Sequence, residues 1–296
     1  RNRGKTGTNT EVEAMRINHN VNSMITKNAL GVNNQHMGKS LEKLSTGLRI
    51  NRASDDAAGL AVSEEMRTQV RGLNRGKANA EDGIALLQVA EGAANEMSSI
   101  LQRMRELSIQ SANDTLTTSD RSYLQQEFTA LTSEIDRIAG GTQYNSQTLL
   151  LGGAGNSFGS NSSSVLHIGP NNTVNDRIQI NIDALTTGAG SLNLTSSVGV
   201  STQAAATNAI DSIDNAIESV NNMRSDMGAY INRLDHAINN IANQRFNTQD
   251  AESRIRDVDF AHETTKFTKS QILSQSATAM LSQANAVPQS VLQLLG

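Results

Sequence analysis

The sequence is poor in the residues that build thick globular cores and covalent cross-links. Among its 296 residues there is no cysteine and no tryptophan, proline occurs twice, and aromatic residues make up 3%. The absence of cysteine excludes disulfides, thiolate metal ligands and a cysteine nucleophile. Because aromatic side chains bury the largest area per residue, we expect long helices packed on alanine, leucine, isoleucine and methionine.

Charged residues are scarce in two stretches, one near each end of the chain. Residues 270–296 contain no Asp, Glu, Lys or Arg, and Lys27 is the only such residue between Ile17 and Gly38. A helix in water normally carries charge on its exposed face, so these ends predict helices that pack together and are surrounded by other protein. The tail is not a membrane span, because Gln, Ser and Asn interrupt its apolar residues. The net charge of −4 gives no reason to expect nucleic acid as a partner.

Apolar residues recur at steps of three or four, the helical period, along most of the chain. If the second helical run is continuous from Asp55 to Ala112, it is about 85 Å long at about 1.5 Å per residue, which indicates a rod. Ser54, which precedes Asp55 and Asp56, is the expected N-cap of this run, and Ser119 and Asp120 are the expected caps of the next helix. A row of apolar residues along one face of a helix is called a seam here, and such seams are expected over residues 37–48, 84–107, 124–138 and 213–241.

The period changes between about residues 144 and 200, where Ser, Gly and Asn become frequent. Residues 165–168 and 177–182 alternate as strands do, and Pro170 begins a turn between them, so we expect a small exposed β-hairpin region with loops. The fold class is therefore mainly α, a long antiparallel helical rod or coiled-coil bundle with a small β-hairpin insert.

The spacing also predicts how the chain divides. Residues 1–14 are polar and aperiodic, and we expect a disordered extension or a cloning remnant there. Residues 15–52 and 257–296 are expected to form a terminal coiled-coil domain. Residues 53–256 are expected to form a helical rod domain with the insert at about 144–200, and a charged joint at 252–257 leads into the tail.

No set of residues predicts catalysis or metal binding. The segment from His262 to Lys266 begins like a zinc-protease helix, but such a helix needs a second histidine four residues after the first, and Lys266 occupies that position. Asp55 and Asp56 would point about 100° apart on a helix, which favours capping over an acid–base pair. We expect no enzyme, no metal and no cofactor.

Several motifs, in order along the chain, resemble those of bacterial flagellins. The N-terminal ones are LSTGLRIN at 44–51 and ASDDAAGLAVS at 53–63, and the C-terminal ones are SRIRDVDFA at 253–261 and QANAVPQ at 283–289. Because the insert is short, the chain is similar to the compact, core-only flagellins.

This resemblance implies a structural subunit that polymerises into the bacterial flagellar filament for motility. It implies export of the unfolded chain through the flagellar secretion channel, to an extracellular or a periplasmic flagellum. The implied partners are other copies in an open helical homopolymer, the flagellar export chaperone, and the filament cap and hook-associated proteins. The alternatives are a hook–filament junction protein or another secreted helical assembly protein.

The resemblance also places the terminal coiled-coil domain in an inner tube of the filament. The apolar residues of the two charge-poor ends are then an assembly seam within and between copies. These residues are Met37, Leu41, Leu44 and Leu48, with Ile272, Leu273, Met280 and Leu281 in the tail.

Residues 102–110 resemble the helix that flagellin-sensing Toll-like receptors recognise in many flagellins. Arg103, Leu107 and, on the next helix, Glu127 stand at the matching positions. The alternative is that these residues serve packing in the filament.

Overall fold

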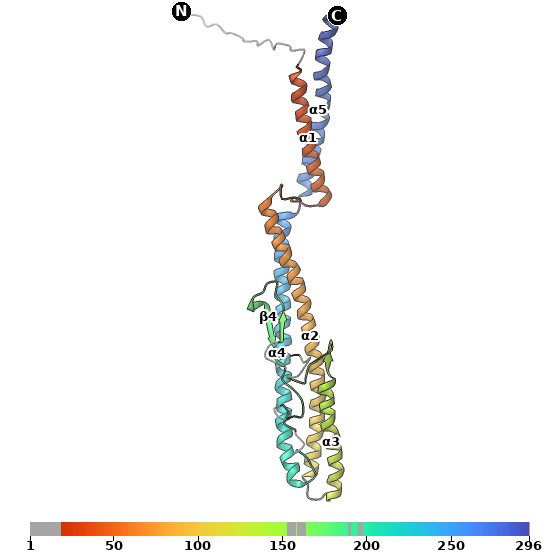
Figure 1. The fold of residues 1–296 in the computed structure, drawn as a ribbon, viewed down its shortest axis with the longest axis vertical. Helices are drawn as coiled ribbons and strands as arrows, with labels where there is room; N and C mark the ends of the chain where they lie inside the picture. The colour runs from red at the N-terminus through yellow and green to blue at the C-terminus, as the bar shows by residue number, and fades with distance from the viewer. Residues whose placement is uncertain (1–18, 153–157, 159–163, 189–190, 195–197, 296) are drawn as a thin grey trace, which may run out of the picture. The chain divides into compact units, whose positions relative to one another are not determined.

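Five α-helices form most of the structure, a computed structural model that describes residues 19–152, 158, 164–188, 191–194 and 198–295. Side chains are described up to residue 286. The predicted extension at 1–14 lies outside the described residues. The helices are α1 (Val21–Thr46), α2 (Ala57–Ser111), α3 (Thr118–Gly141), α4 (Gln203–Arg256) and α5 (Phe260–Leu295), labelled in Figure 1.

Two small antiparallel hairpins lie between α3 and α4, so the predicted fold class is confirmed. The first pairs β1 (Gln143–Tyr144) with β2 (Gln147–Thr148), and the second pairs β3 (Ser164–His167) with β4 (Arg177–Ile180). A short 3₁₀ turn, Val174–Asp176, precedes β4. The first hairpin was not predicted; its turn residues Asn145 and Ser146 both have positive φ, as a type I′ turn requires.

The chain divides into two compact units that we describe separately. The terminal unit comprises Arg1–Glu64 and Ala251–Gly296, and the central unit comprises Glu65–Asp250.

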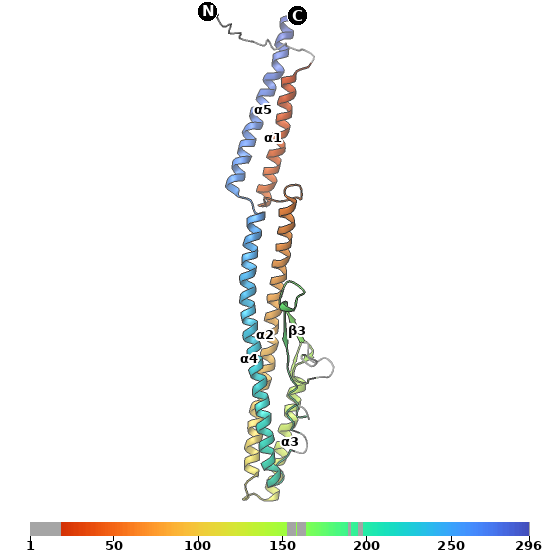
Figure 2. The ribbon, with the colours of Figure 1, turned by 90° about the vertical axis from the view of Figure 1, so that its left-hand side faces the viewer.

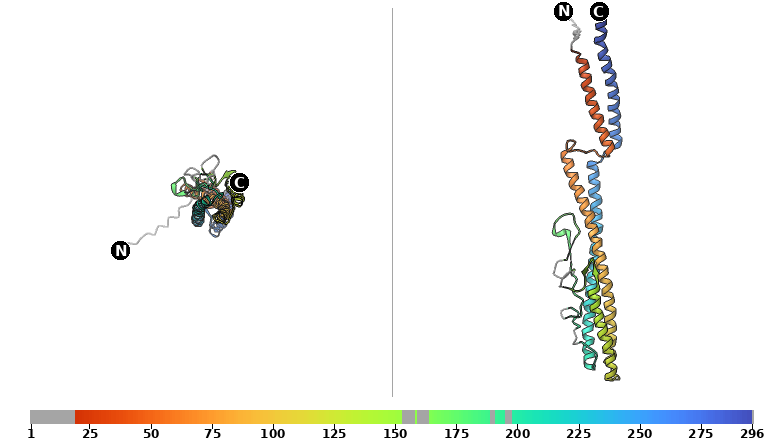
Figure 3. Two further views of the ribbon diagram at one scale, coloured as in Figure 1. Left: turned by 90° about the horizontal axis from the view of Figure 1, so that it is seen from below. Right: turned by 45° about the vertical axis from the view of Figure 1, so that its right-hand side comes forward.

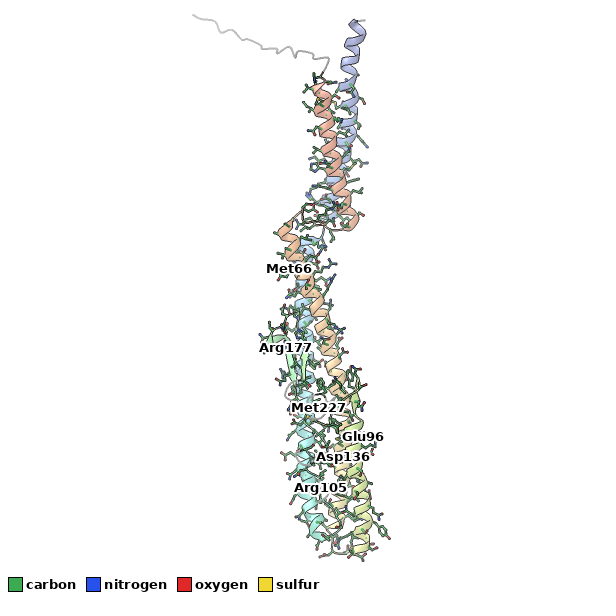
Figure 4. The ribbon with its side chains drawn as sticks, viewed as in Figure 1. Met66, Glu96, Arg105, Asp136, Arg177 and Met227 are labelled. Atoms are coloured by element: carbon green, nitrogen blue, oxygen red, sulfur yellow. The ribbon has the colours of Figure 1, made fainter. Side chains whose placement is uncertain are left out.

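In the central unit, α2 and α4 run antiparallel, and α3 returns along α2 (Figure 1). Arg105 of α2 donates to Asp214 of α4 at 2.6 Å, and Arg245 of α4 donates to Asn74 of α2 at 3.1 Å. Figure 4 labels Arg105 on α2, Asp136 on α3 and Met227 on α4. The polar contacts lie at the surface, so the apolar seams between the helices supply most of the stability.

The seams predicted for the central helices form the core. On α4 the buried residues recur at steps of three and four up to Met227 and at steps of seven from there to Ile241, which is the heptad spacing of a coiled coil. Small alanines alternate with larger residues, which lets the helices approach closely. The core residues on α4 are Ala206, Ala209, Ile213, Ala216, Val220, Met223, Met227, Leu234 and Ile241. Those on α2 include Leu87, Ala90, Ala94, Met97, Leu101, Met104 and Leu107.

From its composition, the insert was expected to be an exposed region. In the structure its apolar residues are buried instead and complete this core. Strand β4 alternates between exposed and buried positions, and Ile178 and Ile180 face inward. Thr187 donates to Asp136 of α3 through both its backbone nitrogen and its hydroxyl, at 2.9 and 2.7 Å. The further buried residues of the insert are Leu149, Leu150, Ile168, Ile182, Leu185, Leu192, Leu194 and Val200.

The second hairpin lies along α2, as Figure 2 shows. A stripe of glycines on α2 allows this approach: a Cβ on Gly76 would lie 2.0 Å from the carbonyl oxygen of Ile168, and one on Gly72 would lie 2.8 Å from Pro170 Cβ. Asn79 of the same face donates to the His167 carbonyl at 2.8 Å. The backbone of the hairpin therefore packs directly on the helix.

Two of the expected helix caps are wrong by two residues. Helix α2 begins after Asp56, whose side chain accepts from the Gly59 backbone nitrogen at 2.9 Å, so Asp56 rather than Ser54 satisfies the first turn. Helix α3 is capped by Thr117 rather than Ser119, because Thr117 and Asp120 form a reciprocal capping box. In both cases the acidic residue takes part in the cap itself.

Gly76→Ala should destabilise the chain, because the added methyl would collide with backbone rather than with a flexible side chain. We expect a loss of about 1–3 kcal/mol in the free energy of unfolding. Gly92→Ala is the matched control: its Cβ would meet nothing within 4 Å, and removing glycine from a helix should stabilise by about 0.5–1 kcal/mol. Urea unfolding measures both. Equal effects of the two substitutions would contradict the direct packing of the hairpin.

Candidate assembly site

Helices α1 and α5 pack side by side in the terminal unit (Figure 1, Figure 3). On both helices, the residues that face the partner recur at alternating steps of three and four, so each helix uses one narrow coiled-coil stripe. The α1 stripe is Ser23, Thr26, Leu30, Asn33, Met37, Ser40 and Leu44. The α5 stripe is Glu263, Phe267, Ser270, Ser274, Ala277, Leu281 and Ala284.

Polar residues make up about half of this interface, and hydrogen bonds cross it. Residues near the start of α1 bond to residues late in α5, and a residue later in α1 bonds to an earlier one in α5, so the two helices are antiparallel. They are Asn20 Nδ2 to the Ala284 carbonyl at 2.6 Å, Ser23 Oγ to Asn285 Oδ1 at 2.8 Å, and Ser274 Oγ to Asn34 Oδ1 at 2.9 Å.

A carboxylate is buried at the base of the pair. Glu263 is only 5% exposed, its side chain hydrogen-bonds Ser40, and Lys266 Nζ lies 3.5 Å from its Oε2. Burial alone would raise the pKa of Glu263, but the Ser40 hydrogen bond and the charges of Lys266 and Lys43 outweigh it and hold the pKa below its ordinary value. The carboxylate is therefore retained in its charged form inside the pair.

Large apolar side chains point away from the pair, and nothing in the described chain covers them. Met24 of α1 is 66% exposed, and Met280 of α5 is 62% exposed. A shallow groove on α5 is lined by Thr264, Thr265, Thr268, Lys269, Ile272 and Leu273. We call the following exposed residues the outer apolar face: Val21, Met24, Ile25, Val32, Leu41, Ile272, Leu273 and Met280.

The structure separates the predicted assembly seam into three places. Inside the pair lie Met37, Leu44 and Leu281, and on the outer apolar face lie Leu41, Ile272, Leu273 and Met280. Leu48 is half-buried beyond the end of α1, where it forms an isolated β-bridge with Asp257. Contacts between copies through these residues stay a prediction. Sequence reasoning followed leucine and isoleucine and so missed the serines and asparagines of the interface, although their heptad spacing is the same.

Backbone hydrogen bonds join the two chain segments at the base of the pair. Gly47 ends α1 in the left-handed conformation, with φ of 72°, and its carbonyl accepts from Val258 at 3.0 Å. Arg49 donates its backbone nitrogen to the Arg256 carbonyl at 2.6 Å. The charged joint expected at 252–257 is shorter than predicted, because residues 252–256 form the last turn of α4.

The residues that match the receptor-binding helix lie in the central unit. Arg103 donates to Glu127 of α3 at 2.9 Å and to Glu106 at 3.1 Å, and all three side chains are at least partly exposed. Leu107 is fully buried in the core. The structure therefore brings Arg103 and Glu127 together at the surface and buries Leu107.

Neither a metal site nor a membrane span is found in the part of the chain that the structure describes. There, no group of three or more His, Asp or Glu side chains could hold an ion, and no described helix has an apolar stretch long enough to cross a bilayer. His262 is exposed on α5.

Acid should weaken the terminal pair through Glu263. Because the pKa of Glu263 is lowered in the folded chain, its contribution is complete at neutral pH and is lost as the pH falls through the folded-state pKa. Hydrogen exchange of residues 260–286, followed from about pH 7 to about pH 3, should therefore show less acid-induced loss of protection in Glu263→Gln than in the unsubstituted chain. Glu42→Gln, at a carboxylate that pairs with Arg52 on the surface, is the control and should leave the pH dependence unchanged. An unaltered profile in Glu263→Gln would contradict this role.

Two family models match the chain and together span most of it. The bacterial flagellin N-terminal helical region matches residues 17–154, and the bacterial flagellin C-terminal helical region matches residues 210–295. Flagellin FlaB2 of Treponema pallidum (strain Nichols) is 46% identical over 285 residues, which cover 95% of this chain and all of that protein. The flagellin of Bacillus subtilis (strain 168) is 45% identical over 307 residues, with the same coverage.

One solved structure supports the fold. A putative flagellar hook-associated protein from Vibrio parahaemolyticus superposes with a TM-score of 0.58 over 69% of this chain and all of that one, at 18% identity. At this identity the likeness concerns the fold alone, whereas the flagellin matches extend over nearly the whole sequence. The chain thus belongs to the bacterial flagellin family, as a structural subunit of the flagellar filament and not an enzyme.

Proposed function

We propose that the terminal pair is the element through which copies of this filament subunit join, and that the outer apolar face is the contact surface. The observation that carries the proposal is that this face is uncovered in the single chain. Two helices side by side can each bury only one stripe, so Met24 and Met280 remain in water unless another chain covers them. Repeated contacts of this kind that do not close a ring build an open helical polymer.

The absence of charge in the tail supports the same proposal. A helix packed on every side by other copies would have to bury any charge on its surface, at a cost of several kcal/mol for an unpaired group. Residues 270–296 carry none, and their polar side chains are Ser, Gln, Asn and Thr, which can be satisfied by hydrogen bonds. We propose that the terminal domain, residues 15–52 with 257–296, lines the inside of the filament.

We further propose that the chain is secreted through the flagellar channel in an unfolded state, which the absence of cysteine permits. The uncharged tail is the proposed segment for the export chaperone, and the filament cap and hook-associated proteins are the proposed neighbours at the filament ends. The filament is proposed to lie outside the cell, with a periplasmic flagellum as the alternative. The competing function, a hook–filament junction protein, would be present in few copies and would not form long filaments alone.

Ile272→Ser should impair polymerisation. Purified chain incubated with seed fragments should form long filaments of uniform width under the electron microscope, and the substitution should raise the critical concentration about tenfold, as expected for the loss of roughly 1.4 kcal/mol of apolar contact. Gln275→Ser, at an exposed polar position of the same helix, should polymerise normally.

Deletion of residues 270–296 should abolish filaments and leave the central unit helical by circular dichroism.

Failure of the unsubstituted chain to form filaments would favour the junction protein. If Ile272→Ser and Gln275→Ser polymerised equally well, the outer apolar face would not be the contact surface.

We also propose that Arg103 and Glu127 form part of a surface that a flagellin-sensing Toll-like receptor can bind on the monomer. Arg103→Ala should lower the signalling potency of monomer in receptor-expressing cells about tenfold, the effect of losing one central contact. Arg105→Ala is the matched control, since it removes an arginine of the same helix that is paired with Asp214. Similar potency of the two variants would assign Arg103 to packing alone.

A further inference from the structure

The exposed methionines in the described part of the chain both belong to the outer apolar face. Met24 of α1 is 66% exposed and Met280 of α5 is 62% exposed. Because the chain has no cysteine, its sulfur is carried by methionine alone. An oxidant that reacts with accessible sulfur therefore reaches this face before the rest of the described chain. The other methionines with described side chains are half-buried or buried; they are Met37, Met66, Met97, Met104, Met223 and Met227.

Hydrogen peroxide converts a methionine thioether to the sulfoxide. One oxygen atom passes from the peroxide to a sulfur lone pair, so sulfur is oxidised by two electrons and water is released. The product is polar and accepts hydrogen bonds, so burying it in an apolar contact without a donor costs free energy. On the single chain the oxidised side chains of Met24 and Met280 would remain largely in water, where this cost does not arise.

Oxidation at these two positions separates assembly from folding. Neither Met24 nor Met280 belongs to the stripes through which α1 and α5 pack on each other. By contrast, Met37 lies in the α1 stripe, and Met97 is fully buried in the core of the central unit. Sulfoxides at those positions would disturb packing within the chain. The methionines that peroxide reaches most easily are thus the ones whose oxidation leaves the folded chain intact.

We propose that Met24 and Met280 are oxidation sites that control assembly of the subunit. Peroxide converts them to sulfoxides in the free chain, which stays folded but no longer packs its outer apolar face on another copy. Packing on another copy covers both sulfur atoms, so the filament is protected. Methionine sulfoxide reductases reverse the change with a dithiol, which becomes a disulfide as water leaves. The effect on assembly rests on the proposed function; the selective oxidation of these side chains does not.

Peptide mass spectrometry after brief treatment with hydrogen peroxide tests the two sites. In the monomeric chain, Met24 and Met280 should gain oxygen at least about ten times faster than Met97, Met104 and Met227, which are fully buried. In filaments both should react at least about ten times more slowly than in the monomer. Circular dichroism should show the same thermal unfolding midpoint before and after this treatment. Equal rates at all five methionines of the monomer would overturn the assignment of the sites.

Leucine variants test the effect on assembly, because leucine keeps the size and apolar character of methionine but has no sulfur. Peroxide should raise the critical concentration of the unsubstituted chain about tenfold, as expected when an apolar contact is lost. The chain with Met24→Leu and Met280→Leu should assemble equally well before and after treatment. Met37→Leu with Met66→Leu keeps both proposed sites and is the matched control, which should lose assembly as the unsubstituted chain does.

Equal sensitivity of the Met24→Leu, Met280→Leu chain and the unsubstituted chain would overturn the proposal. Normal assembly by a chain that carries both sulfoxides would overturn it too. Reductases for both sulfoxide stereoisomers, supplied with a dithiol, should restore filaments, and a failure to do so once both side chains are reduced would contradict the control of assembly. If the untreated chain forms no filaments, the proposed function fails, whereas the oxidation rates of the monomer still decide the sites.

Discussion

In water, a helix can bury only the part of its surface that neighbouring elements cover, and this constraint governs the packing of the chain. With aromatic residues at 3%, the chain has no large side chains to fill a thick core, so burial must come from long helices in contact. In the central unit, three helices and the insert cover one another, and residues such as Met97 and Met227 are fully buried. In the described part of the terminal unit, α1 and α5 pack on each other, and side chains such as Met24 and Met280 stay exposed.

The two units therefore differ in the side chains through which their helices pack. The central helices use apolar heptads, with ion pairs such as Arg105–Asp214 confined to the surface. The terminal helices use heptads in which Ser, Thr and Asn replace about half of the apolar residues, and they retain a buried carboxylate at Glu263. A polar interface is weaker than an apolar one but more selective in its geometry.

Much of the fold could be predicted from the sequence, because the central seams obey a single period over many turns. The seam residues predicted from Leu87 to Leu107 are buried as expected. Only part of the α1 interface could be predicted, because apolar spacing identifies Met37 and Leu44 but not the polar residues, such as Ser40, that share their stripe. The burial of the insert was missed for a related reason: its leucines and isoleucines are scattered among Ser, Gly and Asn and show no period until the hairpin lies on α2.

The uncharged tail has one more physical consequence. Ionic screening acts on charges, with a Debye length of about 8 Å at physiological ionic strength, so it has no direct effect on the contacts that residues 270–286 make. Sulfate and other salts that are excluded from protein surfaces strengthen apolar burial and so favour these contacts. Added salt therefore does not weaken contacts of the uncharged tail through screening.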